Sequence, residues 1–362
     1  MNKPFTIALL LAAATSSPAA GQQQIGVVGA TPINPAAVEI VYTDGHRMTL
    51  DFYGENIFRL FRDDAGGVLR DPEARPPARI LQDNPRKPVA ELRVNSNDST
   101  ISVSTQRITV RIDRRTALMT VTDGLTGATV LEEAEPLRME NGSTTLTLKE
   151  APQEYFYGGG VQNGRFSHKG KAIAIENQNS WTDGGVASPN PFCWSTNGYA
   201  ILWYTFRKGK YDFGLTEKGR VKLTHETGHA DLFVMVDAEA EALLGDYYQL
   251  TDAPALLPKF GLYQGHLNAY NRDYWKEDPD GILFEDGHRY KESQKDGGGG
   301  SVKESLNGEN GNYRFSARAV IDRYAAHDMP LGWLLPNDGY GAGYGQTGTL
   351  DGNIANLKEL TA

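Results

Sequence analysis

Short runs in which apolar and polar residues alternate recur along the first half of the chain, and they constrain its fold more than any other feature. The first three cover residues 38–42, 47–52 and 56–61, with Asp44-Gly45 and Gly54-Glu55 between them. Further runs cover residues 91–94, 100–104, 107–112, 117–122 and 143–148, and no long helical pattern interrupts them. Strands about ten residues apart with turn signals between them are typical of two antiparallel sheets packed face to face. The alternation therefore predicts a β-sandwich.

The order of predicted elements changes after Pro258, to strand, long loop, helix, strand, loop and helix. Residues 260–263 form the first predicted strand, and Ser316 is positioned to cap a helix that ends near His327. The next run, Leu331 to Leu335, is apolar without polar alternation, as in a strand buried on both faces. Two successive units of this kind indicate the start of a (β/α)8 barrel.

Asp338 follows the second of these strands directly, within Pro336-Asn-Asp-Gly339. Barrels and open α/β sheets keep their ligand-binding groups at the carboxyl ends of parallel strands, so Asp338 is the first candidate binding residue. An Asx-turn, in which Asn337 and Asp338 bond their own backbone, explains the same residues equally well.

Composition shifts suggest four segments. Residues 1–21, with an apolar run from Phe5 to Ala14 followed by small residues, are typical of a cleaved secretory signal peptide. Residues 22–250 form the sandwich domain and close with a helical pattern over residues 238–250, and residues 251–258 form a linker. Residues 259–362 begin the barrel, which would be incomplete because a full barrel takes about 250 residues. We therefore expect an exported protein, secreted or periplasmic.

Charge and cysteine content exclude several classes of partner. The formal net charge is −9, with 36 Lys plus Arg against 45 Asp plus Glu, and no basic run suited to nucleic acid occurs. No second apolar run suggests a membrane span. Cys193 is the only cysteine, so neither an intrachain disulfide nor a cysteine-based metal site is possible. No cofactor is expected, and the oligomeric state is left open.

His225-Glu-Thr-Gly-His229 matches the zinc-protease pattern of two histidines four residues apart with a glutamate. That chemistry needs a helix, so that both imidazoles share one face. Strand-like residues flank the motif and Gly228 lies inside it, which predicts a hairpin between residues 221–223 and 232–236. We interpret the match as accidental and expect no metal there.

A polar stretch from Ile175 to Pro191 carries Trp181 and Asp183 among asparagines and glycines. A long polar loop with an embedded tryptophan and carboxylate is a candidate ligand-binding loop. An ordinary solvated loop has the same composition, and the two interpretations remain open.

Four stretches of this chain resemble glycoside hydrolase family 31, the α-glucosidase and α-galactosidase group. They are Glu154-Tyr-Phe-Tyr-Gly-Gly-Gly160, residues 191–203, residues 245–261 with Gly-Asp-Tyr-Tyr-Gln-Leu-Thr-Asp-Ala-Pro, and Met329-Pro-Leu-Gly-Trp-Leu-Leu-Pro-Asn-Asp338. Their order and spacing cover about residues 37 to 360. The resemblance implies a galactose-mutarotase-like sandwich followed by a (β/α)8 catalytic barrel.

The resemblance also implies a retaining mechanism with two aspartates, both on later barrel strands beyond Ala362. No catalytic residue is therefore assigned here, and residues 1–362 alone are expected to be inactive. Asp338 would bind hydroxyls of the sugar that is cleaved, and the loop with Trp181 and Asp183 would close over the same subsite. His266, at the end of the first barrel strand, is a candidate lining residue by position, although a packed histidine fits as well.

The residues after the second strand depart from the Asp-Ile-Asp-Tyr-like sequence of the family's glucosidases, because this chain has Pro336-Asn-Asp-Gly-Tyr340. Together with the long loop before Arg314, this resembles the branch that acts on α-galactosides or α-N-acetylgalactosaminides. The partner would then be an oligosaccharide or glycoside substrate. The alternative is a non-catalytic carbohydrate-binding β-sandwich protein.

Overall fold

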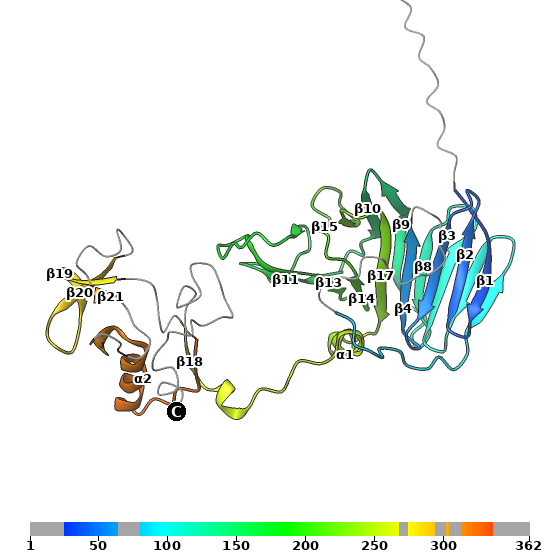
Figure 1. The fold of residues 1–362 in the computed structure, drawn as a ribbon. Helices are drawn as coiled ribbons and strands as arrows, with labels where there is room; N and C mark the ends of the chain where they lie inside the picture. Colours follow the sequence, from blue (N-terminus) through cyan, green and yellow to red (C-terminus); the bar gives the residue numbers. More distant parts are fainter. Residues whose placement is uncertain are drawn as a thin grey trace, which may run out of the picture. The chain divides into compact units, whose positions relative to one another are not determined.

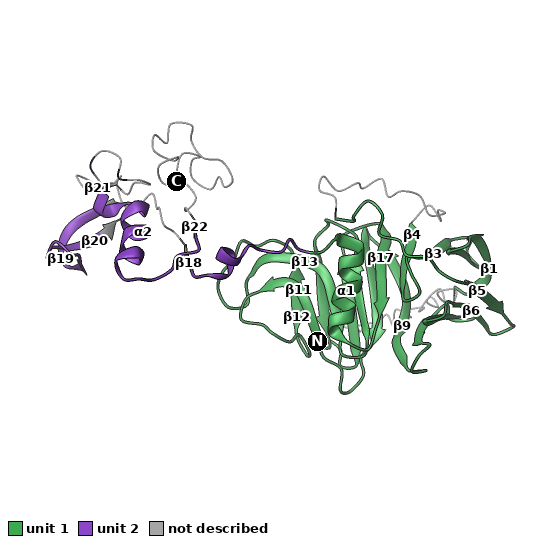
Figure 2. Cartoon of the chain, turned by 90° about the horizontal axis from the view of Figure 1, so that it is seen from below, with its two compact units in different colours: residues 1–253 green, residues 254–362 purple. Residues whose placement is uncertain are grey.

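The computed structural model of this protein describes residues 25–63, 80–267, 274–293, 302–303, 308, 311 and 313–335. The chain divides into two compact units, Met1–Ala253 and Pro254–Ala362 (Figure 2). The expected signal peptide, residues 1–21, lies outside the described residues. In the described ranges, no helix has the length and apolar character needed to cross a membrane.

The first unit contains two antiparallel sheets that form a sandwich, as the alternating runs predict (Figure 1). The eight-stranded sheet has the order β1 (Val27–Asn34), β2 (Ala37–Tyr42), β3 (Arg47–Phe52), β4 (Ile57–Asp63), β17 (His229–Val236), β14 (Tyr199–Trp203), β13 (Val186–Ser195), β11 (Phe156–Gln162). The nine-stranded sheet has the order β12 (Ala172–Ile175), β15 (Gly209–Phe213), β16 (Arg220–His225), β10 (Ser143–Lys149), β9 (Thr129–Glu140), β8 (Met119–Asp123), β7 (Ile108–Asp113), β6 (Thr100–Ser104), β5 (Arg93–Ser96).

The main core lies between these sheets and is built from every second residue of the strands. In β7, Ile108, Val110 and Ile112 are buried, whereas the residues between them are partly or fully exposed. This is the pattern expected when one face of a sheet packs on a core and the other meets solvent. Trp203 and Phe213, from the two different sheets, are fully buried in the same core.

Helix α1 (Ala240–Thr251) confirms the helical pattern expected over residues 238–250. Its buried Leu243 and Leu250 join Leu202 and Phe233 in a second apolar cluster, outside the main core. In Figure 2 the helix lies across strands of the eight-stranded sheet. Because this cluster covers the outer side of β17, that strand is buried at seven of its eight positions instead of alternating.

The hairpin expected around His225–His229 was wrong. β16 and β17 belong to different sheets: β16 pairs with β10 and β15, and β17 pairs with β4 and β14. The segment between them therefore crosses from one layer of the sandwich to the other. The burial patterns give the reason, because β16 alternates as a one-sided strand and β17 is buried on both sides.

The strand expected at residues 260–263 was also wrong, because Lys259–Leu262 form a short 3-10 helix. The turn begins at Pro258, whose carbonyl accepts a hydrogen bond from the Gly261 N–H (2.8 Å), and Phe260 is exposed. The first strand of this unit is instead β18 (Gly265–Leu267). It pairs in parallel with β22 (Trp333–Leu335), with His266 opposite Leu334.

Between these two strands lie the antiparallel strands β19 (Tyr274–Leu283), β20 (Arg289–Ser293) and β21 (Val302–Lys303), and helix α2 (Ala317–Ala326). The turn predicted at Glu285-Asp-Gly287 joins β19 to β20, and Ser316 caps α2 by accepting a hydrogen bond from the Ala319 N–H; both predictions are confirmed. Burial of β22 on both faces is not observed, since Trp333 is 39% exposed. One parallel pair with an intervening helix is compatible with a barrel start, and the barrel itself stays a prediction.

Candidate functional site

The segment with Trp181 and Asp183 connects β12, at the edge of the nine-stranded sheet, to β13 in the other sheet. It is shorter than the polar stretch in the sequence, because β13 already begins at Val186. Trp181 is 74% exposed and Asp183 is also exposed. We call residues 176–185 the Trp181 loop.

Backbone hydrogen bonds fix the Trp181 loop against the turn after β11. The Asn163 N–H donates to the Gly185 carbonyl (3.0 Å), and the Gly184 N–H donates to the Asn163 carbonyl (2.8 Å). The Asn163 side chain also donates to the carbonyl of Ser180 (2.6 Å). One residue, Asn163, therefore holds the loop at its middle and at its C-terminal end, although Trp181 lies in solvent.

Two glycines permit this close packing. Gly164 has φ +68°, and a Cβ there would lie 2.9 Å from Oδ1 of Asp183. A Cβ on Gly185 would lie 2.1 Å from Oγ of Ser180. Since a side chain at either position would displace the loop, the glycines define where Trp181 and Asp183 are presented.

Three aromatic residues lie on β11 and β13 and in the segment that follows β11. Tyr157 of β11 stacks on Trp194 of β13, with ring centroids 4.4 Å apart, and Phe166 meets Tyr157 edge-on at 5.6 Å. Phe166 is 87% exposed. Phe166 follows a turn and belongs to no alternating run, so the sequence pattern did not single it out.

The remaining candidates are not brought together by the described residues. Asp338 lies outside them, and for His266 the structure describes the backbone, in β18, but not the side chain. Trp181 and Asp183 belong to the first unit and His266 to the second. A shared subsite made by these four residues therefore stays a prediction.

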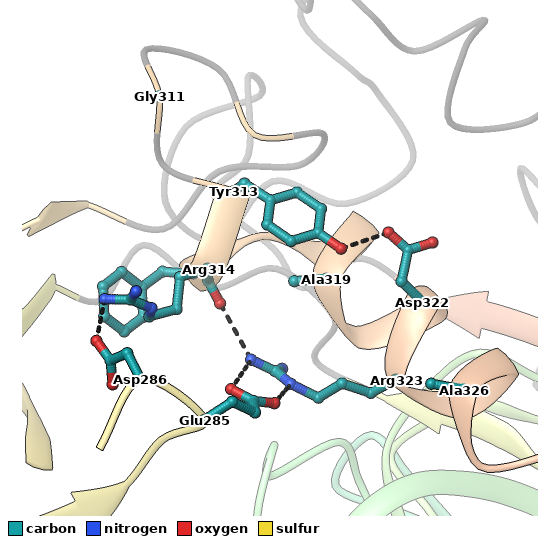
Figure 3. Close-up of a pocket in the computed structure, with 10 residues that line it drawn as sticks. Glu285, Asp286, Gly311, Tyr313, Arg314, Ala319, Asp322, Arg323 and Ala326 are labelled. Carbon is teal, nitrogen blue, oxygen red and sulfur yellow. Dashed lines mark hydrogen bonds and ion pairs between the residues drawn. The ribbon is translucent and has the colours of Figure 1, made fainter. Parts of the chain in front are cut away.

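The second unit contains a cavity of about 720 Å³ between the β19–β20 turn and α2 (Figure 3). Arg323 pairs with Glu285, Arg314 pairs with Asp286, and the Tyr313 hydroxyl donates to Asp322. The hydrogen bond from Arg323 lowers the pKa of Glu285, which keeps this carboxylate ionised and unsuited to donate a proton. These contacts hold the hairpin on the helix and do not form an acid–base pair.

The two histidines of the zinc-like motif have other partners. His225 is fully buried, with Nε2 2.9 Å from the Tyr211 hydroxyl and Nδ1 2.9 Å from the Arg207 carbonyl. His229 Nδ1 lies 2.9 Å from Oγ1 of Thr227. Across the described part of the chain, no group of three or more His, Cys, Asp or Glu side chains could hold a metal ion.

Comparison with known protein families gives a match for part of the sandwich. Residues 47–212 match the model of the glycosyl hydrolase 31 N-terminal galactose mutarotase-like domain. No curated protein sequence matches the chain.

Three solved structures of similar fold illustrate the likeness. A GH31 dextranase of Flavobacterium johnsoniae, complexed with isomaltotriose, is 16% identical over 69% of this chain and 31% of its own, with a TM-score of 0.62. A GH31 α-xylosidase from a soil metagenome, complexed with xylose, is 18% identical over 66% and 36%, with a TM-score of 0.54. The cycloalternan-forming enzyme of Listeria monocytogenes is 15% identical over 68% and 24%, with a TM-score of 0.53.

This chain thus spans between 24% and 36% of the length of these solved structures. At such identities the structures establish a shared fold, and the likeness to glycosyl hydrolase 31 proteins over residues 47–212 comes from the matched domain model. The match covers most of the sandwich, from β3 to β15. Residues 47–212 of this chain are therefore similar to the galactose mutarotase-like domain found at the N-terminus of glycosyl hydrolase 31 proteins.

Proposed function

We propose that the whole protein is an exported, retaining α-glycosidase that hydrolyses O-glycosyl bonds, and that the Trp181 loop binds its substrate. The observation that carries this proposal is the Trp181 loop itself, an exposed indole and carboxylate held by hydrogen bonds on a family 31 N-terminal domain. The proposed layout is a signal peptide at residues 1–21, the sandwich at 22–250, a linker at 251–258 and the catalytic barrel from residue 259.

The chemistry of the loop suits a sugar. The indole face of Trp181 offers an apolar surface to the C–H groups of a pyranose ring, and the Asp183 carboxylate accepts hydrogen bonds from its hydroxyls. Because the loop is held by Asn163 before any ligand arrives, little conformational entropy is lost on binding. In this proposal Asp338 and His266 are substrate-binding residues as well.

We assign the substrate to α-galactosides or α-N-acetylgalactosaminides in preference to α-glucosides. The support is Pro336-Asn-Asp-Gly-Tyr340, which differs from the sequence typical of the family's glucosidases. The solved structures include a dextranase and an α-xylosidase, so α-glucosides and α-xylosides belong in the same assay. The assay measures substrate preference as the ratio of the kcat/KM values for these glycosides.

The test is hydrolysis of aryl α-glycosides by the whole protein, with variants at two positions. Asp338→Ala should lose most activity. Trp181→Ala should lower kcat/KM about tenfold, ~1.4 kcal/mol, with Phe206→Ala as the control because Phe206 is an exposed aromatic outside the loop. Unchanged activity in both test variants would exclude the proposed subsite. If no glycoside is cleaved while residues 22–250 bind sugar as tightly as the whole protein, the non-catalytic alternative is correct.

A further inference from the structure

An exposed aromatic side chain, Phe166, lies in the segment that follows β11, residues 163–168. β11 is an edge strand of the eight-stranded sheet (Figure 1). Phe166 is 87% exposed, more than the Trp181 indole at 74%. Apolar side chains that are exposed singly are common on protein surfaces and need no explanation. Phe166 differs from these because its ring has aromatic neighbours, its backbone is fixed and it lies near the Trp181 loop.

The ring of Phe166 packs against a stacked pair of aromatic side chains. It meets Tyr157 at an interplanar angle of 72°, and Tyr157 in turn stacks on Trp194 at 21°. Trp194 packs against the second apolar cluster, which includes Phe192 and Leu202. The three rings are therefore connected to the packed part of the sandwich, while most of the Phe166 ring stays open to a ligand.

Hydrogen bonds on both sides of Phe166 fix the backbone that carries it. On the N-terminal side, Nη1 of Arg165 donates to the carbonyl of Ala172 in β12 (2.7 Å). On the C-terminal side, the His168 N–H donates to the carbonyl of Phe156 in β11 (2.9 Å). A side chain presented from a fixed backbone loses less conformational entropy when it binds a ligand.

Phe166 lies close to the Trp181 loop, because the turn that precedes it contacts this loop. A Cβ on Gly164 would lie 2.9 Å from Oδ1 of Asp183, and a Cβ on Gly184 would lie 3.6 Å from Nη2 of Arg165. Two residues of extended chain span about 7 Å, so the Phe166 Cα lies within about 12 Å of the Asp183 carboxylate. Two adjoining sugar rings can bridge a distance of this size.

We propose that Phe166 binds the ring next to the sugar held by Trp181, so that this site takes a substrate of at least two rings. This inference rests on the proposed function of the Trp181 loop. The apolar face of a phenylalanine ring suits the C–H groups of a pyranose, as an indole does. Because phenylalanine has no hydrogen-bonding group, Phe166 selects for the presence of a second ring and not for the positions of its hydroxyls.

Kinetics of the whole protein with two substrates of the same sugar test this inference, the sugar being the one that it cleaves fastest. The α-glycosyl fluoride has no ring beyond the cleaved sugar, whereas the 4-nitrophenyl α-glycoside carries a second ring there. Phe166→Ala should lower the kcat/KM for the 4-nitrophenyl glycoside, relative to that for the fluoride, at least tenfold. Phe166→Tyr keeps the aromatic face and should restore most of this ratio.

Two further variants separate this inference from the proposed function. Trp181→Ala should lower kcat/KM for both substrates, and Phe206→Ala, at an exposed aromatic outside residues 163–185, should change neither. An unchanged ratio in Phe166→Ala, with both substrates still cleaved, would overturn the inference and leave the proposed function in place. If the unsubstituted protein cleaves no α-glycoside, the proposed function is rejected and this inference with it.

Discussion

At the scale of single residues, the sandwich contains ionisable groups whose burial makes stability depend on pH. His225 is the clearest example, because burial lowers its pKa to about 4. The unfolded chain binds a proton near pH 6.5 and the folded chain does not until about pH 4, so stability is lost as the pH falls between these values. The shift corresponds to about 3 kcal/mol.

His225→Gln should therefore change the free energy of unfolding of the first unit, measured in urea, more favourably at pH 4.5 than at pH 7.5, by about 2–3 kcal/mol relative to the unsubstituted chain. His288→Gln should not, since His288 is exposed and lies in the second unit. An equal effect of His225→Gln on stability at the two pH values would show that burial of His225 does not make stability depend on pH.

Glu133 should act in the opposite direction. Its pKa is raised to about 8 by burial, from about 4.5 in the unfolded chain, so folding is opposed increasingly as the pH rises between these values. Glu133→Gln keeps an acceptor for the Met119 N–H and removes the titration. It should be more stable than the unsubstituted chain at pH 8.5, on the order of 4 kcal/mol, and nearly equal at pH 4.5.

Thermal unfolding at the two pH values measures this effect. Glu132→Gln is the control, since the neighbouring Glu132 pairs with Lys149 in solvent. A Glu133→Gln variant less stable at pH 8.5 would mean that Glu133 is ionised in the fold and is paired with Arg62.

At the scale of elements, glycines decide how closely β11 and β13 approach. Gly160 has φ +78°, and a Cβ there would lie 2.1 Å from the Ser188 carbonyl oxygen and 2.6 Å from the Asn190 nitrogen. Gly160→Ala should therefore separate the strands and destabilise the first unit by about 2–4 kcal/mol. Gly219→Ala has a similar φ of +80° and no neighbour within 4 Å, so it should cost about 1 kcal/mol.

Urea midpoints of the two glycine variants separate steric exclusion from backbone strain. If both variants lose the same stability, the close approach of β11 to β13 has no energetic consequence.

Local sequence patterns predicted the helices, strands and turns better than they predicted which strands pair with each other. The alternation of β7, the cap at Ser316 and the turn at Glu285-Asp-Gly287 each depend on neighbouring residues, and each was confirmed. The partners of β16 and β17 depend on contacts with β4, β10, β14 and β15, which a local pattern does not contain. The strand predicted at residues 260–263 was wrong for a related reason, because apolar composition alone does not distinguish a buried strand from an exposed turn.

At the scale of the whole molecule, the first unit should fold without the second. Both apolar clusters of the first unit are made from residues of that unit alone. A fragment of residues 22–253 should therefore unfold cooperatively, with a urea midpoint close to that of the first transition of the full chain. A fragment that fails to fold, or loses more than about 2 kcal/mol, would show that the second unit stabilises the sandwich.

The sequence by itself determined the sandwich class, the helix at α1 and the resemblance to family 31, because periodicity, capping and turn chemistry act over a few residues. It also selected Trp181 and Asp183 as a candidate site. The tertiary structure decided which strands pair, that Asn163 holds the Trp181 loop, and that Arg62 is buried over the Tyr42 ring. These properties arise where distant segments meet, and burial in three dimensions is what sets the cost of a charge.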